Sequence, residues 1–239
     1  MTAPTAAVVV LAAGSGTRVG AEVNKILLPL RGRPVLAWSV RTALAVPGVD
    51  PVVVVHRAGE RADVGAALLP VIADREVLLV EGGASRQDSE QAALAALAGR
   101  VADGSVDVVV LHDGARPLAP LELFAATIAT ARAYGGAVPA HELAGLLPRD
   151  AAAAPSPGGP GTRLVGVATP QAFRAAPLLA AYRAAAEAGF DGTDTAAAFT
   201  QFAPAGHDVR AVPADPGNVK VTFAEDLRLA ARLLAESGF

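Results

Sequence analysis

Residues 8–25, VVVLAAGSGTRVGAEVNK, decide how this chain folds. The apolar run at 8–11 is of the kind that is buried on both faces of a parallel sheet. Two glycines in the loop that follows remove Cβ atoms, so that backbone N–H groups can close on phosphate oxygens. Arg18 and Lys25 add positive charge to the same region. The stretch therefore predicts a strand that ends in a triphosphate-binding loop.

Three phosphate-binding motifs compete for this loop. A Walker A motif, GxxxxGK[ST], is excluded because no lysine here follows a glycine. A dinucleotide fingerprint fits in part, through glycines at 14, 16 and 20. It requires, however, that a long helix follow the glycines directly, and the RGRP at 31–34 would interrupt such a helix. A nucleotidyltransferase loop of the form LAAGxGxR…K matches in full. A glycine-rich turn with incidental surface cations is the remaining alternative.

Length and composition limit the class of protein. The 239 residues suit one α/β domain, 1–239, and 52% apolar with 4% aromatic residues predicts a core of Ala, Val and Leu. A net charge of −3 without a basic block argues against nucleic-acid binding as the main role. The absence of cysteine excludes a disulfide framework and a thiolate nucleophile. Without a cationic leader pattern or an apolar run of about 18 residues, a cytoplasmic protein is expected.

Val-rich runs alternate along the chain with Ala/Leu-rich stretches of helical period. The alternation predicts βαβ units, and therefore an α/β fold with a Rossmann-like, mostly parallel sheet and helices on both faces. The predicted strands are 7–11, 52–56, 76–80, 106–111, 136–140, 164–167, 208–212 and 219–221. The predicted helices are 34–46, 58–69, 85–98, 120–134, 175–188, 194–201 and 223–237.

Several residues predict helix ends. Ser85 with Asp88 forms a capping-box pattern, as does Thr222 with Glu225. Asp194 suits the N-cap of the helix that follows it. Glycines at 135 and 238 stand where C-terminal caps belong.

The segment 141–163 has no sustained helical period and is rich in Pro, Gly, Ser and Ala. Two interpretations are open. The segment is either a disordered surface loop or a hairpin arm, with its tip near 151–161, that projects from the sheet and grips a second subunit. We take such an arm to span 139–167 within the single domain.

Polar clusters follow two of the predicted strands, where ligands of open α/β sheets bind. The first cluster begins with paired glycines at 82–83, which let a flat base approach the backbone, and Ser89 can hydrogen-bond that base. A turn with an N-cap explains the same residues. The second cluster is HDGARP at 112–117, in which Asp113 suits a metal–phosphate or a sugar hydroxyl and Arg116 suits a phosphate. An Asp–Arg pair that fixes a loop is the alternative.

Lys220 lies between valines in NVKVT, so that buried valines would turn it toward the strand-end cleft. A solvated strand face is the alternative. His56, His141 and His207 lack the spacing of metal ligands, and we expect them in surface or loop positions.

Together these stretches resemble the 2-C-methyl-D-erythritol 4-phosphate cytidylyltransferases of the non-mevalonate isoprenoid pathway. The resemblance extends over almost the whole chain, in the family's order and near its spacing. It rests on LAAGSGTR at 11–18 with NK at 24–25, LPLRGRPVLAWSV at 28–40, EGGxxRxDS at 81–89, LHDGARP at 111–117, TPQAF at 169–173, TD at 193–194 and NVKVTxxEDL at 218–227. It implies a fold of the nucleotide-diphospho-sugar transferase type and a homodimer clasped through the arm.

The resemblance also implies a reaction in which CTP and a polyol phosphate give a CDP-alditol and pyrophosphate, assisted by Mg²⁺ or another divalent cation. Such chemistry needs positioning and charge neutralisation more than it needs a base. By motif position, Arg18 and Lys25 would stabilise the transition state. The CTP-binding set would be Ala12, Ala13, Gly14, Ser15, Gly16 and Thr17, with Gly83 and Ser89 at the cytosine. The acceptor set would be Asp113, Arg116, Thr169 and Lys220, with Asp113 also the candidate metal ligand.

The chain departs from the family pattern at the start of the arm. The family has a proline-valine-x-aspartate-threonine stretch whose threonine contacts the substrate phosphate across the dimer, whereas 139–143 reads PAHEL. Leu143 or Ala144 thus stands in place of the threonine and its hydroxyl group. A family arginine later in the arm has no residue in register with it in this chain, and Arg163 is the candidate replacement. Each charge-assisted hydrogen bond lost would cost roughly 1.5–3 kcal/mol of phosphate binding.

That departure keeps other functions open. One is a cytidylyltransferase for another alditol phosphate, such as ribitol 5-phosphate. Another is a nucleotide-binding homologue with little turnover. An NAD(P)-binding dehydrogenase is a separate alternative, which does not depend on the arm.

Overall fold

One mixed sheet organises the chain, for which the computed structural model describes residues 3–14, 24–143, 165–192 and 194–236. The strand order is β10-β7-β9-β6-β1-β4-β5, with β8 paired to β7. The strands are β1 (Thr5–Leu11), β4 (Val49–His56), β5 (Val77–Glu81), β6 (Val106–Asp113), β7 (Gly135–Glu142), β8 (Val165–Val167), β9 (Gln171–Arg174) and β10 (Asp208–Pro213). Only β8 and β9 run antiparallel to their neighbours, so the predicted, mostly parallel sheet is confirmed.

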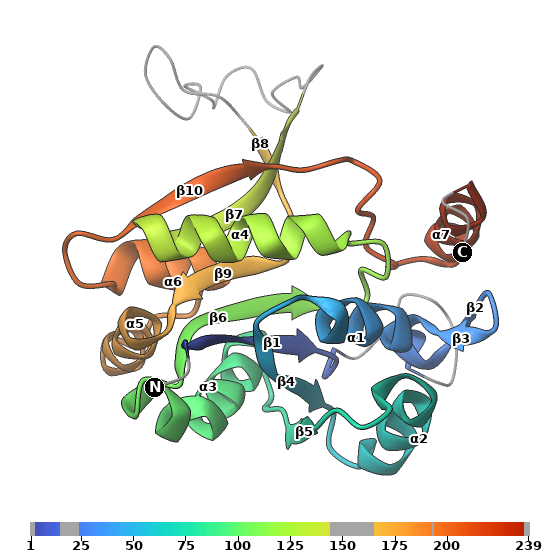
Figure 1. Ribbon diagram of the computed structural model, residues 1–239, viewed down its shortest axis with the longest axis horizontal. Coiled ribbons are helices and arrows are strands. Elements are labelled where there is room, and N and C mark those ends of the chain that lie inside the picture. The colour runs from blue at the N-terminus through green and yellow to red at the C-terminus, as the bar shows by residue number, and fades with distance from the viewer. Residues whose placement is uncertain (1–2, 15–23, 144–164, 193, 237–239) are drawn as a thin grey trace.

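Helices cover both faces of this sheet, as predicted (Figure 1). One face carries α1 (Val35–Ala45), α2 (Arg61–Ile72) and α4 (Leu121–Tyr134). The other face carries α3 (Arg86–Ala102), α5 (Ala175–Glu187) and α6 (Thr195–Phe202). Beyond the carboxyl ends of the central strands lie the short η2 helix (Lys25–Leu27), the hairpin of β2 (Pro29–Leu30) and β3 (Arg33–Pro34), and α7 (Ala224–Glu236).

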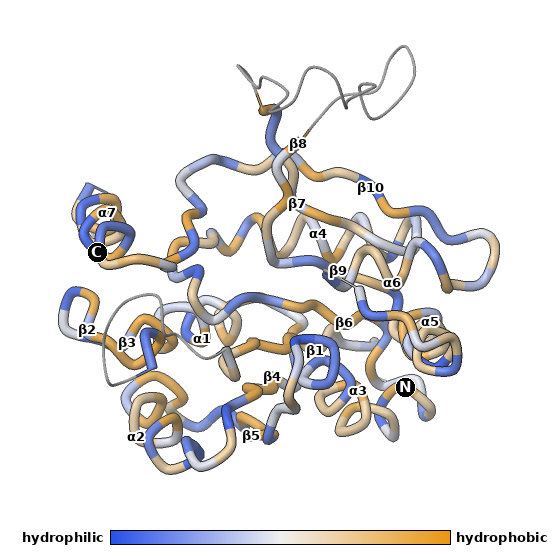
Figure 2. The backbone as a smooth tube through the Cα atoms, turned by 180° about the vertical axis from the view of Figure 1, so that it is seen from behind, coloured by the Kyte–Doolittle hydropathy of each residue, from blue (hydrophilic) through white to orange (hydrophobic). Residues whose placement is uncertain are grey.

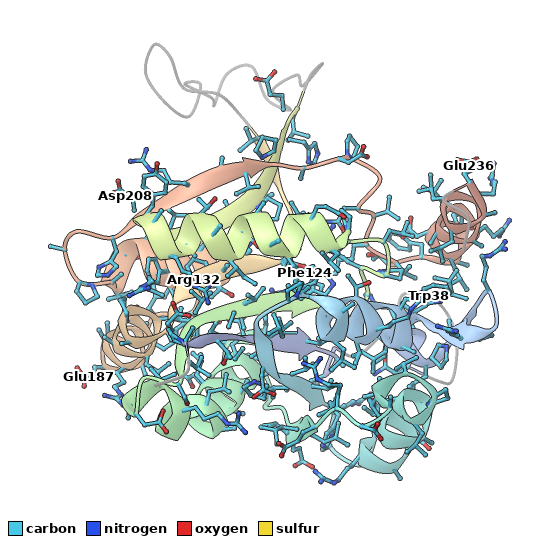
Figure 3. All side chains as sticks on the ribbon, viewed as in Figure 1. Trp38, Phe124, Arg132, Glu187, Asp208 and Glu236 are labelled. Atoms are coloured by element: carbon cyan, nitrogen blue, oxygen red, sulfur yellow. The ribbon has the colours of Figure 1, made fainter. Side chains whose placement is uncertain are left out.

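Alternation along β1 shows why these residues form a central strand. Val8 and Val10 pack with the core beneath α1 and α4, while Val9 packs with the core beneath α3 and α5. Figure 2 shows the hydrophobic colour concentrated on the central strands β1 and β4. Phe124, labelled in Figure 3, is fully buried between α4 and the sheet. A strand buried on both faces needs branched apolar residues throughout, which is the pattern that predicted it.

The sequence predictions are wrong at two places in the sheet. Residues 219–221 form no strand; a single backbone bond, from the N–H of Val221 to the carbonyl of Ala115 (2.8 Å), ties them to the loop after β6. The strand β9 was not predicted, because four residues with a polar start carry too little pattern. It runs between β6 and β7 and closes the sheet there.

Most predicted caps are confirmed. Ser85 and Asp88 form the expected capping box of α3, and Asp194 caps α6 by accepting the N–H of Ala197 (2.9 Å). At α7, however, Asp226 rather than Glu225 accepts the N–H groups of Thr222 and Phe223, at 2.8 Å each. The prediction failed because the helix begins one residue later than expected.

The base of the predicted arm is an antiparallel pair. Ala140, His141 and Glu142 on β7 pair with Val167, Gly166 and Val165 on β8 (Figure 1). The rest of the arm, 144–164, and Gly238 lie outside the described residues. None of the described helices is long and apolar enough to cross a membrane.

Candidate active site

A pocket of about 740 Å³ lies at the carboxyl ends of β1, β4 and β6. The chain runs from β1 toward β4 and β5 on one side and later returns to β6 on the other side of β1. Such a reversal opens a crevice between neighbouring strand ends, which is where ligands of open α/β sheets bind. The sheet therefore places the pocket at the end of the glycine loop that the sequence singled out.

Backbone hydrogen bonds fix the loop that follows β1. The N–H of Ala12 donates to the carbonyl of Val55 (2.8 Å), and the N–H of Gly114 donates to the carbonyl of Leu11 (2.9 Å). Ala12, Ala13 and Gly14 line the pocket, as expected of a phosphate-binding loop.

The turn at 82–83 has no room for a side chain. A Cβ on Gly82 would lie 2.7 Å from Ser89 Oγ and 2.8 Å from Ala13 Cβ, and a Cβ on Gly83 would collide with Asp88. Ser89 Oγ accepts the N–H of Gly83 (3.2 Å) and donates its hydrogen to the carbonyl of Ser85 (2.9 Å). Toward the pocket the hydroxyl thus offers a lone pair, which suits an amino-group donor.

Lys25 reaches the pocket from the η2 helix. The turn is held by Asn24, whose side-chain oxygen accepts the N–H of Ile26 (3.4 Å) and whose amide donates to Glu60 Oε2 (2.8 Å). Lys25 is only 9% exposed although it carries a charge. The chain has two lysines against 18 arginines, and both lysines, Lys25 and Lys220, line this one pocket.

Asp113, at the end of β6, gathers three cations. Its Oδ1 accepts from Arg86 Nη1 (2.8 Å), and its Oδ2 lies 3.0 Å from Lys220 Nζ and 3.3 Å from Arg116 Nε. Burial alone would raise the pKa of Asp113, but the charges of Arg86, Lys220 and Arg116 outweigh it and hold that pKa well below its usual range. Asp113 is therefore ionised and organises the cations around it.

Arg116 and Thr169 belong to a layer behind the pocket lining. Arg116 Nη1 donates to the carbonyl of Asn218 (2.7 Å), and Asn218 donates to the carbonyl of Thr169 (2.8 Å). Thr169 Oγ1 accepts the N–H of Asp113 (2.9 Å) and lies 3.2 Å from Nδ1 of His112. Their assigned contacts with the acceptor stay predictions, whereas their support of Asp113 and of the 218–220 segment is seen directly.

His112 and His56 are buried. The prediction for His56, a surface or loop position, is therefore wrong, because this residue is the buried last residue of β4. Burial lowers the pKa of His112 to about 4, so that its ring is neutral and serves as a hydrogen-bonding partner of Thr169 and the Arg116 carbonyl.

Arg86 lines the pocket and was missed as a site residue. It is the first residue of α3, where a cation is disfavoured by the helix dipole. That unfavourable position is the signal that could have found it. Burial alone would lower the pKa of Arg86, but Asp113 and Glu90 raise it instead. Arg57, exposed at the end of β4, is a second pocket cation without a predicted role.

Some predicted residues cannot be placed. Ser15, Gly16, Thr17, Arg18 and Arg163 lie outside the described residues, and their roles stay predictions.

The described residues do not form a resident metal site. No group of three or more His, Cys, Asp or Glu side chains within 3–14, 24–143, 165–192 and 194–236 could hold a metal ion. Asp113 is the one carboxylate among the described pocket-lining residues, and both of its oxygens already bond cations. The pocket has the charge of an anion site, with Lys25, Arg57, Arg86 and Lys220 against a single carboxylate.

Comparison with known proteins identifies the family. The sequence model of IspD, 2-C-methyl-D-erythritol 4-phosphate cytidylyltransferase, matches residues 6–236. The chain belongs to this family. It is 40% identical over 240 residues to the 2-C-methyl-D-erythritol 4-phosphate cytidylyltransferase of Cereibacter sphaeroides, with 97% of each chain covered. It is 44% identical over 242 residues to a bifunctional IspD/IspF enzyme of Clavibacter michiganensis, covering 97% of this chain and 55% of that one.

A solved structure gives the same result. The 4-diphosphocytidyl-2C-methyl-D-erythritol synthase of Anaerococcus prevotii superposes with a TM-score of 0.80 and 26% identity, over 97% of this chain and 96% of that one. The fold predicted from the sequence, of the nucleotide-diphospho-sugar transferase type, is the fold of this family. The pocket is lined by residues from the matched stretches at 11–14, 82–89 and 113–115, together with Lys25 and Lys220.

Proposed function

We propose that this chain transfers the cytidylyl group of CTP to 2-C-methyl-D-erythritol 4-phosphate in isoprenoid biosynthesis. A phosphate oxygen of the acceptor bonds to the α-phosphorus of CTP, the bond from that phosphorus to the β-phosphate oxygen breaks, and pyrophosphate leaves. The observation that carries the proposal is the meeting of both lysines of the chain in one cationic pocket at the carboxyl ends of β1, β4 and β6.

The nucleotide would bind on the side of the pocket formed by backbone. Ala12 to Gly14 offer backbone atoms to the triphosphate, and Gly82 and Gly83 leave room for a flat base. Ser89 offers a lone pair, which fits the 4-amino group of cytosine better than the 4-oxo group of uracil.

The acceptor would bind on the side formed by charged side chains. Lys220 and Arg86 line this side, and Asp113 holds both in place. Lys25, which lines the same pocket, would neutralise charge that develops at the α-phosphate. In-line phosphoryl chemistry of this kind depends on such positioned charges, and Arg18 is proposed to share the role by its motif position.

A divalent cation is proposed as part of the substrate. Since the described residues do not fit a resident ion, Mg²⁺ would arrive on the triphosphate oxygens of CTP.

We further propose that two copies of the chain associate through the 139–167 arm. Support comes from the β7–β8 pair at its base, which exposes the apolar side chains Leu143 (40%), Val165 (38%) and Val167 (50%). Apolar side chains exposed together on one hairpin are typical of an interface. Light scattering should give the mass of a dimer for the wild type, and Val167→Lys should shift the mass toward the monomer; a monomeric wild type would refute the association.

The test of the reaction is pyrophosphate release from CTP and Mg²⁺ with 2-C-methyl-D-erythritol 4-phosphate, compared with ribitol 5-phosphate. Turnover is expected with the first acceptor. Turnover only with ribitol 5-phosphate would refute the proposed acceptor, and CTP binding without turnover of either would refute the proposed reaction. Neither alternative is favoured by the curated relatives, which are named for the first acceptor.

A further inference from the structure

Glu90 is a buried carboxylate that the proposed reaction does not use. It lies on α3 one turn after Arg86 and is 2% exposed. Its Oε1 accepts from Arg86 Nε (2.9 Å) and from Thr195 Oγ1 (3.0 Å), and its Oε2 accepts from the hydroxyl of Tyr182. The donors come from α3, α5 and α6, so three helices converge on one carboxylate.

Packing alone does not call for a charge at this position. Burial raises the pKa of Glu90, although Arg86, Tyr182 and Thr195 all act to lower it. The net rise means that ionising Glu90 costs free energy in the folded protein, so the stability of the fold alone does not explain a carboxylate at this position. The function of the Glu90 carboxylate therefore lies in the side chain that it binds.

Glu90 holds Arg86 in a fixed orientation. Arg86 Nε donates to Glu90 and Nη1 donates to Asp113 Oδ1 (2.8 Å). Its remaining nitrogen, Nη2, makes no hydrogen bond to any residue that the structure describes, and its side chain is 32% exposed at the pocket. Two carboxylates thus fix the guanidinium from two sides and leave one pair of N–H groups for a ligand.

We propose that Glu90 is a positioning residue, held by Tyr182 and Thr195, which fixes Arg86 so that its Nη2 donates to a phosphate oxygen of the bound substrates. The inference deepens the proposed function and rests on it for the identity of the ligand. Preorganisation of this kind matters because a guanidinium that must first be ordered by its ligand binds the ligand more weakly.

A double-mutant cycle with Glu90→Gln and Arg86→Ala tests the inference. Glu90→Gln keeps the hydrogen-bonding shape but removes the charge, and it is expected to lower kcat/KM about tenfold or more. In the Arg86→Ala background the same change should have almost no further effect, because the residue through which Glu90 acts is gone. Equal effects of Glu90→Gln in both backgrounds, or an unchanged kcat/KM in Glu90→Gln, would overturn the proposal.

Two further variants separate positioning from folding. Tyr182→Phe removes one donor to Glu90 and should lower kcat/KM less than Glu90→Gln does. Asp107→Asn is the matched control, since Asp107 also pairs with two arginines, Arg132 (2.9 Å) and Arg174 (3.3 Å), at the far end of β6 from the pocket (Figure 3 labels Arg132). It should lower the melting temperature without changing kcat/KM. A Tyr182→Phe variant with wild-type kinetics would contradict the inference.

Failure of the proposed reaction can be distinguished from failure of the positioning role of Glu90. If the wild-type chain binds CTP but does not turn over, the reaction is refuted, and the same cycle is read in the Kd for inorganic phosphate with CTP bound, because Arg86 lies on the acceptor side of the pocket. Weaker phosphate binding in Glu90→Gln that vanishes in the Arg86→Ala background supports the positioning role; equal affinity in all four proteins overturns it.

Discussion

On one side of the pocket, the loop at 12–14 and the turn at 82–83 present backbone atoms, while on the other side Asp113, Arg86 and Lys220 present charged side chains. The backbone side is shaped by hydrogen bonds between neighbouring strand ends and by glycines that admit no Cβ. The charged side is assembled from β6, α3 and the 218–222 segment around a single carboxylate. The two sides should therefore fail in different ways when they are altered.

The difference has a physical origin. Shape complementarity to a flat base is lost by a few tenths of an ångström of displacement, whatever the charge. A cluster of one carboxylate and three cations is disrupted when the charge of one member is removed, even if its side chain keeps the same shape. Kinetic constants measured separately for CTP and for the acceptor can tell these two failures apart.

The largest effect is expected at Lys25, which lines the same pocket and is almost fully buried. Lys25→Ala should reduce kcat by about a hundredfold or more, because a charge that stabilises the transition state in a buried site is removed. Steady-state pyrophosphate release measures it. Arg210→Ala is the control, since Arg210 lies on the edge strand β10, away from the pocket, where it pairs with Asp208 (2.8 Å) and lies over the ring of Tyr134 (5.1 Å). Near-normal turnover of Lys25→Ala would refute the role of Lys25 in stabilising the transition state.

The next effect is expected at Asp113. Asp113→Asn keeps the side-chain shape but leaves Arg86, Arg116 and Lys220 without their common counter-charge. We expect the KM for the acceptor to rise about tenfold or more, with a much smaller change in the KM for CTP. Asp107→Asn again provides the carboxylate-to-amide control. An equal rise in both KM values would contradict the division of the pocket into two sides.

Gly82 is the matching test of the backbone side. Gly82→Ala would place a Cβ 2.8 Å from Ala13 Cβ and 2.7 Å from Ser89 Oγ, so the turn must move away from the β1 loop. The KM for CTP is expected to rise about tenfold, with the acceptor KM nearly unchanged. Gly99→Ala on α3 is the control, because its Cβ would enter open space and should be neutral or stabilising. A Gly82→Ala enzyme with wild-type CTP kinetics would refute the tight fit.

The backbone side could be predicted from the sequence because its signals are local. The apolar run at 8–11, the glycines at 82–83 and the Ser85–Asp88 capping box each lie within a few residues, and all three elements are confirmed. The sheet followed from the same kind of signal, since a strand buried on both faces carries its apolar pattern in its own residues.

The charged side could be predicted only in part. Asp113 and Lys220 were identified singly, but their contact spans 107 positions of sequence and appears only in the fold. Arg86 was missed because its partner in the pocket, Asp113, lies on β6, 27 positions further along the chain, and only the fold brings the two side chains together. The short strand β9 was missed because its order between β6 and β7 is imposed by the sheet and not by its four residues.

The smallest effect concerns stability, and it tests whether the charged side extends to Glu90. Its pKa is raised in the folded protein, so between the ordinary carboxyl pKa and the raised one the folded state binds more protons than the unfolded chain. The contribution of Glu90 to stability is therefore present at low pH and is lost as the pH rises through the raised pKa.

Glu90→Gln should remove this dependence of stability on pH. Urea unfolding of both proteins between about pH 5 and pH 8 measures it, and the wild type should lose stability relative to the variant as the pH increases. A difference that is constant across this range, or one of opposite sign, would mean that Arg86, Tyr182 and Thr195 offset the burial of Glu90 in full, and the carboxylate would then need no functional explanation.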